Sequence, residues 1–358
     1  MYRSSLNRFL LAIAALISAP AIAGADEGGV SFWIPGFFGS LAAVPQQPGW
    51  SLTSIYYHTS VSAAGDVAIA RERTLGSIPI NVMLSAGLNA NVNAQGDLGL
   101  AVLSYVSPTP ILGGQASFSL LGLYGRMSTS LAAQLSGTVS ASVGGAPIGS
   151  IPFSRSDSIS DALWGFGDLL PQFALRWNAG VNNYMVYVTG DVPVGAYDPS
   201  RLSNIGIGHG TVDAGFGYTY FNQKTGHELS GVLGFTYNMS NQQTQYQNGV
   251  DLHFDWGASQ FLTKQFQVGV VGYVYDEVGC DSGSGDRVGC FRSRVVGVGP
   301  QVGFIIPISS TTQGYLNLKG YKEFDNANRP DGWNAWVTFV LSPAQQTPSS
   351  ATRRMRSM

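Results

Sequence analysis

Charged residues are scarce in this chain of 358 residues. Lys and Arg number 19 and Asp and Glu number 21, together 11% of the sequence, against about 25% in an ordinary soluble domain. A soluble monomer of this size needs a polar surface, which Ser, Thr, Asn and Gln would have to supply. The formal net charge of −2 argues against a nucleic-acid partner, because phosphate binding requires clustered Lys and Arg.

Long hydrophobic runs are missing beyond the N-terminus. The longest later run, residues 30–44, is broken by Pro35, Gly36 and Gly39, whereas a spanning helix needs about 20 consecutive apolar residues. This argues against an α-helical membrane protein. The sequence does contain 44% apolar residues, 11% aromatic residues and 46 glycines, and such a composition excludes disorder. An extracellular β protein and a protein embedded in lipid remain.

The N-terminus has the pattern of a secretory signal peptide. Arg3 and Arg8 flank the start of a short apolar run, residues 9–17, and small residues at 21–25 supply a cleavage site. The run is too short for a transmembrane anchor, and Pro20 interrupts it. We predict that residues 1–23 are a signal peptide that exports the chain from the cytoplasm.

The mature chain alternates between apolar and polar positions. From Ile80 to Asn93 nearly every even position is apolar and nearly every odd position is polar, which predicts a strand with two different faces. Residues 131–143 and 250–258 repeat the pattern. A soluble sandwich would give the same alternation, so strand length has to distinguish the two classes.

Most of the predicted strands have about 12 to 14 residues, whereas soluble strands average about 5 to 6 and a tilted membrane strand needs about 9 to 11. They are residues 51–60, 80–93, 96–107, 114–127, 131–143, 167–178, 182–193, 210–221, 227–239, 250–262, 265–277, 293–306, 312–324 and 333–341. Short connections such as 94–95 and 128–130 alternate with long ones such as 61–79 and 144–166. We therefore predict an all-β fold, a transmembrane antiparallel β-barrel of about 14 strands within a range of 12 to 16, in the outer membrane of a Gram-negative cell.

Four segments resemble, in the same order, a family of outer-membrane proteins associated with the meta-pathway of phenol degradation. They are Gly165–Leu169 (GFGDL), Gly226–Ser230 (GHELS), Val296–Phe304 (VGVGPQVGF) and Tyr321–Phe339 (YKEFDNANRPDGWNAWVTF). The resemblance covers about residues 28–342. It implies a barrel similar to fatty-acid and aromatic-hydrocarbon channels, with passive uptake of hydrophobic or aromatic small molecules. The chain departs from the usual aromatic C-terminus of such barrels, because a polar tail, residues 342–358, follows Phe339.

Residues 24–50 precede the barrel, which we place at residues 51–341. Phe32, Trp33, Phe37 and Phe38 make this segment too apolar for a free periplasmic tail, and its prolines and glycines interrupt any strand. We predict a hatch in the barrel mouth whose aromatic rings line the path of an apolar solute. The alternative is a packed plug without ligand contact. In the longest predicted loop a short helix, residues 157–170, would bring Trp164 and Phe166 to the same path.

Charged residues on the polar faces of the predicted strands are candidates for the barrel lumen. They are Asp213, Glu228, Asp251, His253, Asp255 and Lys319, and such faces tune selectivity in barrels. The alternative is that they only solvate the interior and form ion pairs. His253 between two aspartates suggests a metal, but the three side chains would spread over about 13 Å along one strand face. We therefore predict no metal site and no cofactor.

Cys280 and Cys290 are the only cysteines, and they flank a Gly- and Ser-rich stretch. In an oxidising compartment such a pair predicts a disulfide, worth about 3 kcal/mol in the chain-entropy model. Metal binding would require further Cys or His nearby.

Three classes of function stay open at this point. A channel for apolar or aromatic solutes is favoured, a structural or adhesive barrel is the main alternative, and an outer-membrane hydrolase is the third. The sequence around Ser282 and Ser284 resembles a nucleophile elbow only in degenerate form, so we predict that the protein is not an enzyme. The expected partners are membrane lipid, the barrel-assembly machinery and apolar small molecules, and the oligomeric state is open.

Overall fold

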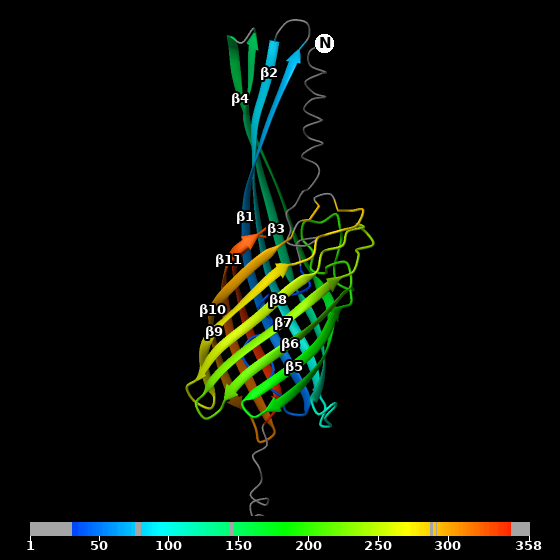
Figure 1. Ribbon diagram of the computed structural model, residues 1–358, viewed down its shortest axis with the longest axis vertical. Coiled ribbons are helices and arrows are strands. Elements are labelled where there is room, and N and C mark those ends of the chain that lie inside the picture. The colour runs from blue at the N-terminus through cyan, green and yellow to red at the C-terminus, as the bar shows by residue number, and fades with distance from the viewer. Residues whose placement is uncertain (1–30, 76–79, 144–145, 287–288, 291, 345–358) are drawn as a thin grey trace, which may run out of the picture.

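The computed structural model describes residues 31–75, 80–143, 146–286, 289–290 and 292–344, without the side chains of residues 65–84, 86 and 88. Twelve strands form one closed antiparallel barrel in which sequence neighbours pair and β1 pairs with β12 (Figure 1). The strands are β1 (Gly49–Leu75), β2 (Ile80–Val106), β3 (Gln115–Val143), β4 (Ala146–Ala179), β5 (Asn182–Asp191), β6 (Thr211–Asn222), β7 (His227–Asn238), β8 (Asp251–Phe261), β9 (Phe266–Glu277), β10 (Arg294–Pro307), β11 (Thr312–Ala327) and β12 (Asp331–Pro343). The predicted signal peptide and nearly all of the polar tail lie outside the described residues.

The barrel has 12 strands and not about 14, because two of the predicted turns are absent. Residues 94–95 lie within β2, and residues 128–130 lie within β3. The one-to-one register between these two strands runs through both places without a shift. The polar residues there do not reverse the chain. They mark the level at which the outward side of each strand changes from apolar to polar.

The first four strands are much longer than the others and project from one end of the barrel (Figure 1). Pairing of β1 with β12 ends at Ser62 opposite Asp331, and continuous pairing of β4 with β5 ends at Gln172 opposite Thr189. Beyond these levels the four strands continue as a sheet, here called the projecting sheet: residues 63–75, 80–93, 130–143 and 146–160. The predicted loops 61–79 and 144–166 are therefore largely strand.

The helix predicted at residues 157–170 is wrong. These residues belong to β4 and pair with β3, from Asp157 opposite Ala133 to Leu170 opposite Leu121. The helix propensity of residues such as Ala162 and Leu163 is weak, and pairing with a long neighbouring strand overrides it.

Apolar side chains form a belt on the outward side of the barrel. Those between 36% and 63% exposed include Trp50, Leu52, Leu103, Phe118, Phe173, Tyr184, Val186, Phe216, Leu233, Phe235, Tyr237, Phe304, Leu318 and Val337. An outward apolar belt with aromatic residues is the surface that a membrane barrel presents to lipid. The described residues contain no helix with the length and hydropathy needed to cross a bilayer.

The hydrophobic core lies inside the barrel. Inward residues from opposite walls, such as Leu100, Tyr273 and Trp336, join Phe32 and Trp33 of the N-terminal segment in one buried cluster. The interior of this barrel is therefore filled by its own chain around the level of these residues.

Candidate functional site

The N-terminal segment, residues 31–48, passes through the interior of the barrel. At the end with the projecting sheet, Arg329 in the β11–β12 connection donates a hydrogen bond to Ser31. At the opposite end, where β3 begins, the backbone N–H of Gln46 donates to Gln115 Oε1 (2.7 Å), and Gln115 Nε2 donates to the Gln46 carbonyl (2.6 Å). The segment predicted as a hatch therefore lies in the lumen over its whole described length.

Asp255 of β8 and Lys319 of β11 hold the backbone of this segment from two sides. Asp255 accepts hydrogen bonds from the N–H groups of Gly36 (2.9 Å) and Phe38 (3.0 Å). The Lys319 ammonium donates to the carbonyls of Gly36 (2.6 Å) and Phe38 (3.3 Å). We call this pair the charged clamp. Because it binds main-chain groups, it fixes the path of the segment independently of its side chains.

Further polar side chains continue this row of contacts. Glu228 accepts from the Leu41 N–H (2.9 Å), Thr219 accepts from the Ala43 N–H (3.1 Å), and the Arg176 guanidinium donates to the Ala42 carbonyl (3.2 Å). Of the predicted lumen residues, Glu228, Asp255 and Lys319 therefore bond the backbone of the segment directly. Arg176 and Thr219 were missed. The signal for Arg176 is that it is the only cation in the predicted strand 167–178.

His253 and Asp213 form a buried pair beneath Trp33. The Trp33 and His253 rings are stacked with centroids 3.5 Å apart and planes inclined by 14°. His253 Nε2 donates to Asp213 Oδ2 (2.9 Å), which also accepts from the Thr236 hydroxyl (2.6 Å). The pair orients the imidazole as a flat platform for an indole. No Ser or Cys nucleophile bonds to this histidine among its described contacts, since Nδ1 has no hydrogen-bond partner.

Asp251, the remaining predicted lumen residue, is the first residue of β8. It is buried near the end of the barrel with the projecting sheet, where Asn238 donates a hydrogen bond to it (2.9 Å). Within the part of the chain that the structure describes, no group of three or more His, Cys, Asp or Glu side chains is arranged to hold a metal ion.

An apolar cavity lies between the N-terminal segment and the wall formed by β2 to β5. Its lining is Phe32, Trp33, Ile34, Phe37, Val102, Leu121 and Leu170, with Ser119, Gln172 and Thr189 as polar members, and its volume is about 40 Å³. Of the six aromatic residues predicted to line a solute path, Phe32, Trp33 and Phe37 are brought together here. Phe38 packs beside them, with its ring centroid 5.7 Å from that of Trp33.

Trp164 and Phe166 do not line the lumen. They are 61% and 71% exposed on the outward side of β4, and both rings pack near Tyr124 of β3, with centroids 6.1 and 4.8 Å away. The prediction that they contact solute inside the barrel depended on an inward helix, which the structure replaces with a strand. Aromatic residues at this level are typical of the rim of a membrane barrel.

Arg201 ties the β5–β6 connection to β4. Its guanidinium donates two hydrogen bonds to Asp161 (2.7 and 3.1 Å), and the Ser203 N–H donates a third (3.2 Å). Bonding to the guanidinium lowers the pKa of Asp161 below its usual value. The carboxylate therefore stays ionised at neutral pH and covers an edge of β4 that β5 leaves unpaired.

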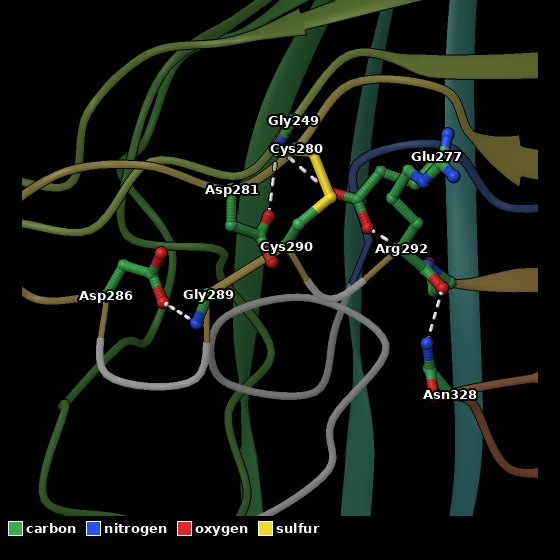
Figure 2. Close-up of a disulfide and its surroundings, with 10 residues drawn as sticks. Gly249, Glu277, Cys280, Asp281, Asp286, Gly289, Cys290, Arg292 and Asn328 are labelled. Atoms are coloured by element: carbon green, nitrogen blue, oxygen red, sulfur yellow. Dashed lines mark hydrogen bonds between the residues drawn. A yellow bond between two sulfur atoms is a disulfide. The ribbon is translucent and has the colours of Figure 1, made fainter.

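The β9–β10 connection contains a disulfide between Cys280 and Cys290, with Cα atoms 4.6 Å apart. Figure 2 shows the bond beside Asp281, whose carboxylate accepts a hydrogen bond from the Gly249 N–H (3.0 Å). Ser282 also pairs with Gln247 of the β7–β8 connection. The disulfide therefore closes a loop that is pinned to its neighbour at the same end of the barrel.

Replacing both cysteines by serine is expected to open this loop without unfolding the barrel. Closing a loop of this size is worth about 3 kcal/mol, so the initial rate of trypsin cleavage after Arg287, which lies between the two cysteines, should rise at least about tenfold. Reduction of the unmodified protein should give the same increase, and Ser284→Ala in the same loop should give none. Equal cleavage rates with and without the disulfide would contradict the expectation.

Residues 77–339 match the profile of a protein family described as "Putative MetA-pathway of phenol degradation". The fold is similar to that of the COG4313 outer membrane channel from Pseudomonas putida F1, with a TM-score of 0.58, 14% identity, and coverage of 87% of this chain and 100% of that one. A Pseudomonas aeruginosa FadL homologue gives a TM-score of 0.31 with 10% identity, over 87% of this chain and 94% of that one. A search of curated proteins finds no match. The first similarity shows that the two chains share a barrel fold.

Proposed function

Because the chain belongs to the protein family of the phenol meta-pathway, we propose that it is an outer-membrane channel through which hydrophobic or aromatic small molecules diffuse passively. In this proposal the N-terminal signal first directs export of the chain, and the barrel-assembly machinery then inserts it into the outer membrane. There the apolar belt contacts lipid. The fold of an outer membrane channel and the belt support the location.

The observation that carries the proposal is the apolar cavity against the N-terminal segment. Aromatic rings of the segment form one side of it and aliphatic wall residues such as Val102 and Leu121 form the other, which suits a ligand without charge. An apolar cavity of about 150 Å³ holds benzene, whereas this one has about 40 Å³. A solute therefore enters only when the segment moves, so we propose that residues 31–48 act as a hatch.

Uptake of an aromatic carbon source by intact cells tests the function. A strain lacking the gene is expected to take up naphthalene at limiting concentration about fivefold more slowly than the parent strain, because the outer membrane then limits entry. The purified protein in liposomes should restore flux of the same solute. Equal uptake by the two strains, together with protein-containing liposomes that are no more permeable than empty ones, would refute the channel.

The projecting sheet is the observation that favours the alternative, a structural or adhesive barrel. It extends far from the barrel wall, and a channel for small molecules does not need it in order to span a membrane. A structural role predicts that the deletion strain loses surface attachment or envelope integrity while naphthalene uptake is unchanged. The uptake experiment therefore separates the two functions.

A further inference from the structure

The first strands change the character of their outward side where they leave the apolar belt. On β2 the outward residues are Gly99, Ala101, Leu103 and Tyr105 in the belt, and Asn89, Asn91, Asn93 and Gln95 beyond it. On β3 they are Phe118, Leu120 and Tyr124 in the belt, and beyond it Arg126, Ser128, Ser130, Gln134 and Ser136, with Ala132 as the apolar exception. This is the change expected where the outer surface passes from lipid into water.

The inward side of the same strands stays apolar beyond that level. Its residues are Val61 and Ala63 of β1, Ala90, Val92 and Ala94 of β2, and Leu131, Ala133 and Leu135 of β3, here called the apolar track. The register places them side by side, with Val92 opposite both Ala63 and Leu131. Among the described strands, β2 pairs with β1 and β3 alone, and the track residues are half-buried between their neighbours in the sheet, with no further strand paired over them. An uncovered apolar surface in water costs free energy, and a structural sheet does not need one.

The track is continuous with the cavity in the lumen. Along β2 the inward positions run from Val92 through Leu98 and Leu100 to Val102, with no shift in register against β1 or β3. Val102 and its β3 counterpart Leu121 line the cavity beside Phe32. One apolar surface therefore extends from the projecting sheet to the N-terminal segment. From Leu135 to Leu121 it spans about 48 Å at the rise of an extended strand.

The surface suits a neutral ligand. No described inward position of β2 from residue 89 to 106, or of β3 from 117 to 137, carries a charged side chain, and Thr129 is the polar member nearest to the track. Charge lies at its border on β4, where Arg155 is opposite Leu135, Asp157 is opposite Ala133, and Asp161, paired with Arg201, is opposite Thr129. A carboxylate or phosphate would lose its hydration on the track, where the bordering cations Arg155 and Arg201 already have the carboxylates of Asp157 and Asp161 beside them.

We propose that the apolar track is a capture surface on which neutral apolar solutes, such as aromatic hydrocarbons, bind outside the membrane before they move along β2 and β3 to the cavity. This inference rests on the proposed channel function and adds a binding site to it. Continuity of the track with the cavity identifies the occupant as the transported solute. The track raises the occupancy of the channel by solute when the solute concentration is low. It does not set the maximal uptake rate, which depends on the hatch.

Neighbouring residues on opposite sides of β3 allow a matched test. The track variant carries Leu131→Asn, Ala133→Asn and Leu135→Asn, and the control carries Ser130→Asn, Ala132→Asn and Gln134→Asn on the outward side of the same segment. We expect the track variant to need five to ten times more naphthalene for half-maximal uptake, with a maximal rate within twofold of the unmodified protein. The control should match the unmodified protein. Heat-dependent migration in SDS gels verifies that both barrels are folded.

Each outcome has one reading. Suppose that cells with the unmodified protein take up naphthalene faster than the deletion strain. If the track variant then needs the same naphthalene concentration for half-maximal uptake as the unmodified protein, the capture surface is refuted and the channel function stands. If cells with the unmodified protein take up naphthalene no faster than the deletion strain, the proposed function is refuted, and the capture surface is refuted with it. An equal loss of 1-naphthoate uptake overturns the restriction to neutral solutes. If the unmodified protein is a dimer in nanodiscs and the track variant is a monomer, a second copy of the chain covers this face. That result also refutes the proposal.

Discussion

Removal of residues 31–45 is expected to raise the flux of small solutes through the reconstituted protein at least about tenfold. In the intact chain this segment fills the interior, where Phe32 and Trp33 are buried in the central cluster. The barrel wall does not depend on the segment for closure, because β12 pairs directly with β1 from Leu52 to Ser62. The deletion should therefore leave a folded and open barrel. Liposome permeation of naphthalene and of a neutral sugar measures the increase.

A reversible lock provides the control for this deletion. The hydroxyl oxygens of Ser40 in the segment and Ser259 on β8 are 2.6 Å apart, so Ser40→Cys with Ser259→Cys should form a disulfide with little rearrangement. The oxidised variant should conduct several-fold less naphthalene than the unmodified protein, and reduction should restore the flux. If locked and unlocked proteins conduct equally, the segment is a static plug and the hatch proposal is wrong.

The sequence predicts the class of fold and the burial of Phe32 and Trp33 for identifiable reasons. Alternation of apolar and polar residues over long stretches is a local property, and together with strand length it indicates a membrane barrel. The aromatic content of residues 32–38 likewise predicts burial. The count of about 14 strands failed because the polar residues near 94–95 and 128–130 were interpreted as turns. Alternation with unbroken parity through both places was the sign that each was one continuous strand.

The contacts of the site could not be predicted in the same way. Asp255 and Lys319 are more than sixty residues apart, and they meet the same backbone only because the order and register of β8 to β11 bring their side chains to one level of the lumen. The alternation of strand faces predicts that both side chains point into the barrel, but it does not predict which groups they bond. The partners of Asp255 are main-chain groups of Gly36 and Phe38, which leave no mark in the sequence.

Within the charged clamp, Lys319→Met is expected to destabilise the protein by about 3 kcal/mol, because the buried Asp255 loses the favourable charge of Lys319 and the segment loses the hydrogen bonds of the ammonium. The same change frees the carbonyls of Gly36 and Phe38, so flux should rise together with the loss of stability. Lys322→Met, at an exposed position of the same strand, should change stability by no more than about 0.5 kcal/mol. Urea unfolding in liposomes, followed by tryptophan fluorescence, measures both variants.

The double variant Asp255→Asn with Lys319→Met separates the cost of the buried Asp255 charge from the cost of the hydrogen bonds that Lys319 loses. An amide cannot accept both N–H bonds of the segment as a carboxylate does, but it carries no charge that burial would penalise. Stability should therefore recover by about half, whereas flux should stay raised because the segment is still released. If the double variant is as unstable as Lys319→Met alone, the cost lies in the lost hydrogen bonds of the ammonium to the segment and not in the buried charge of Asp255. If its flux returns to that of the unmodified protein, the clamp does not hold the hatch.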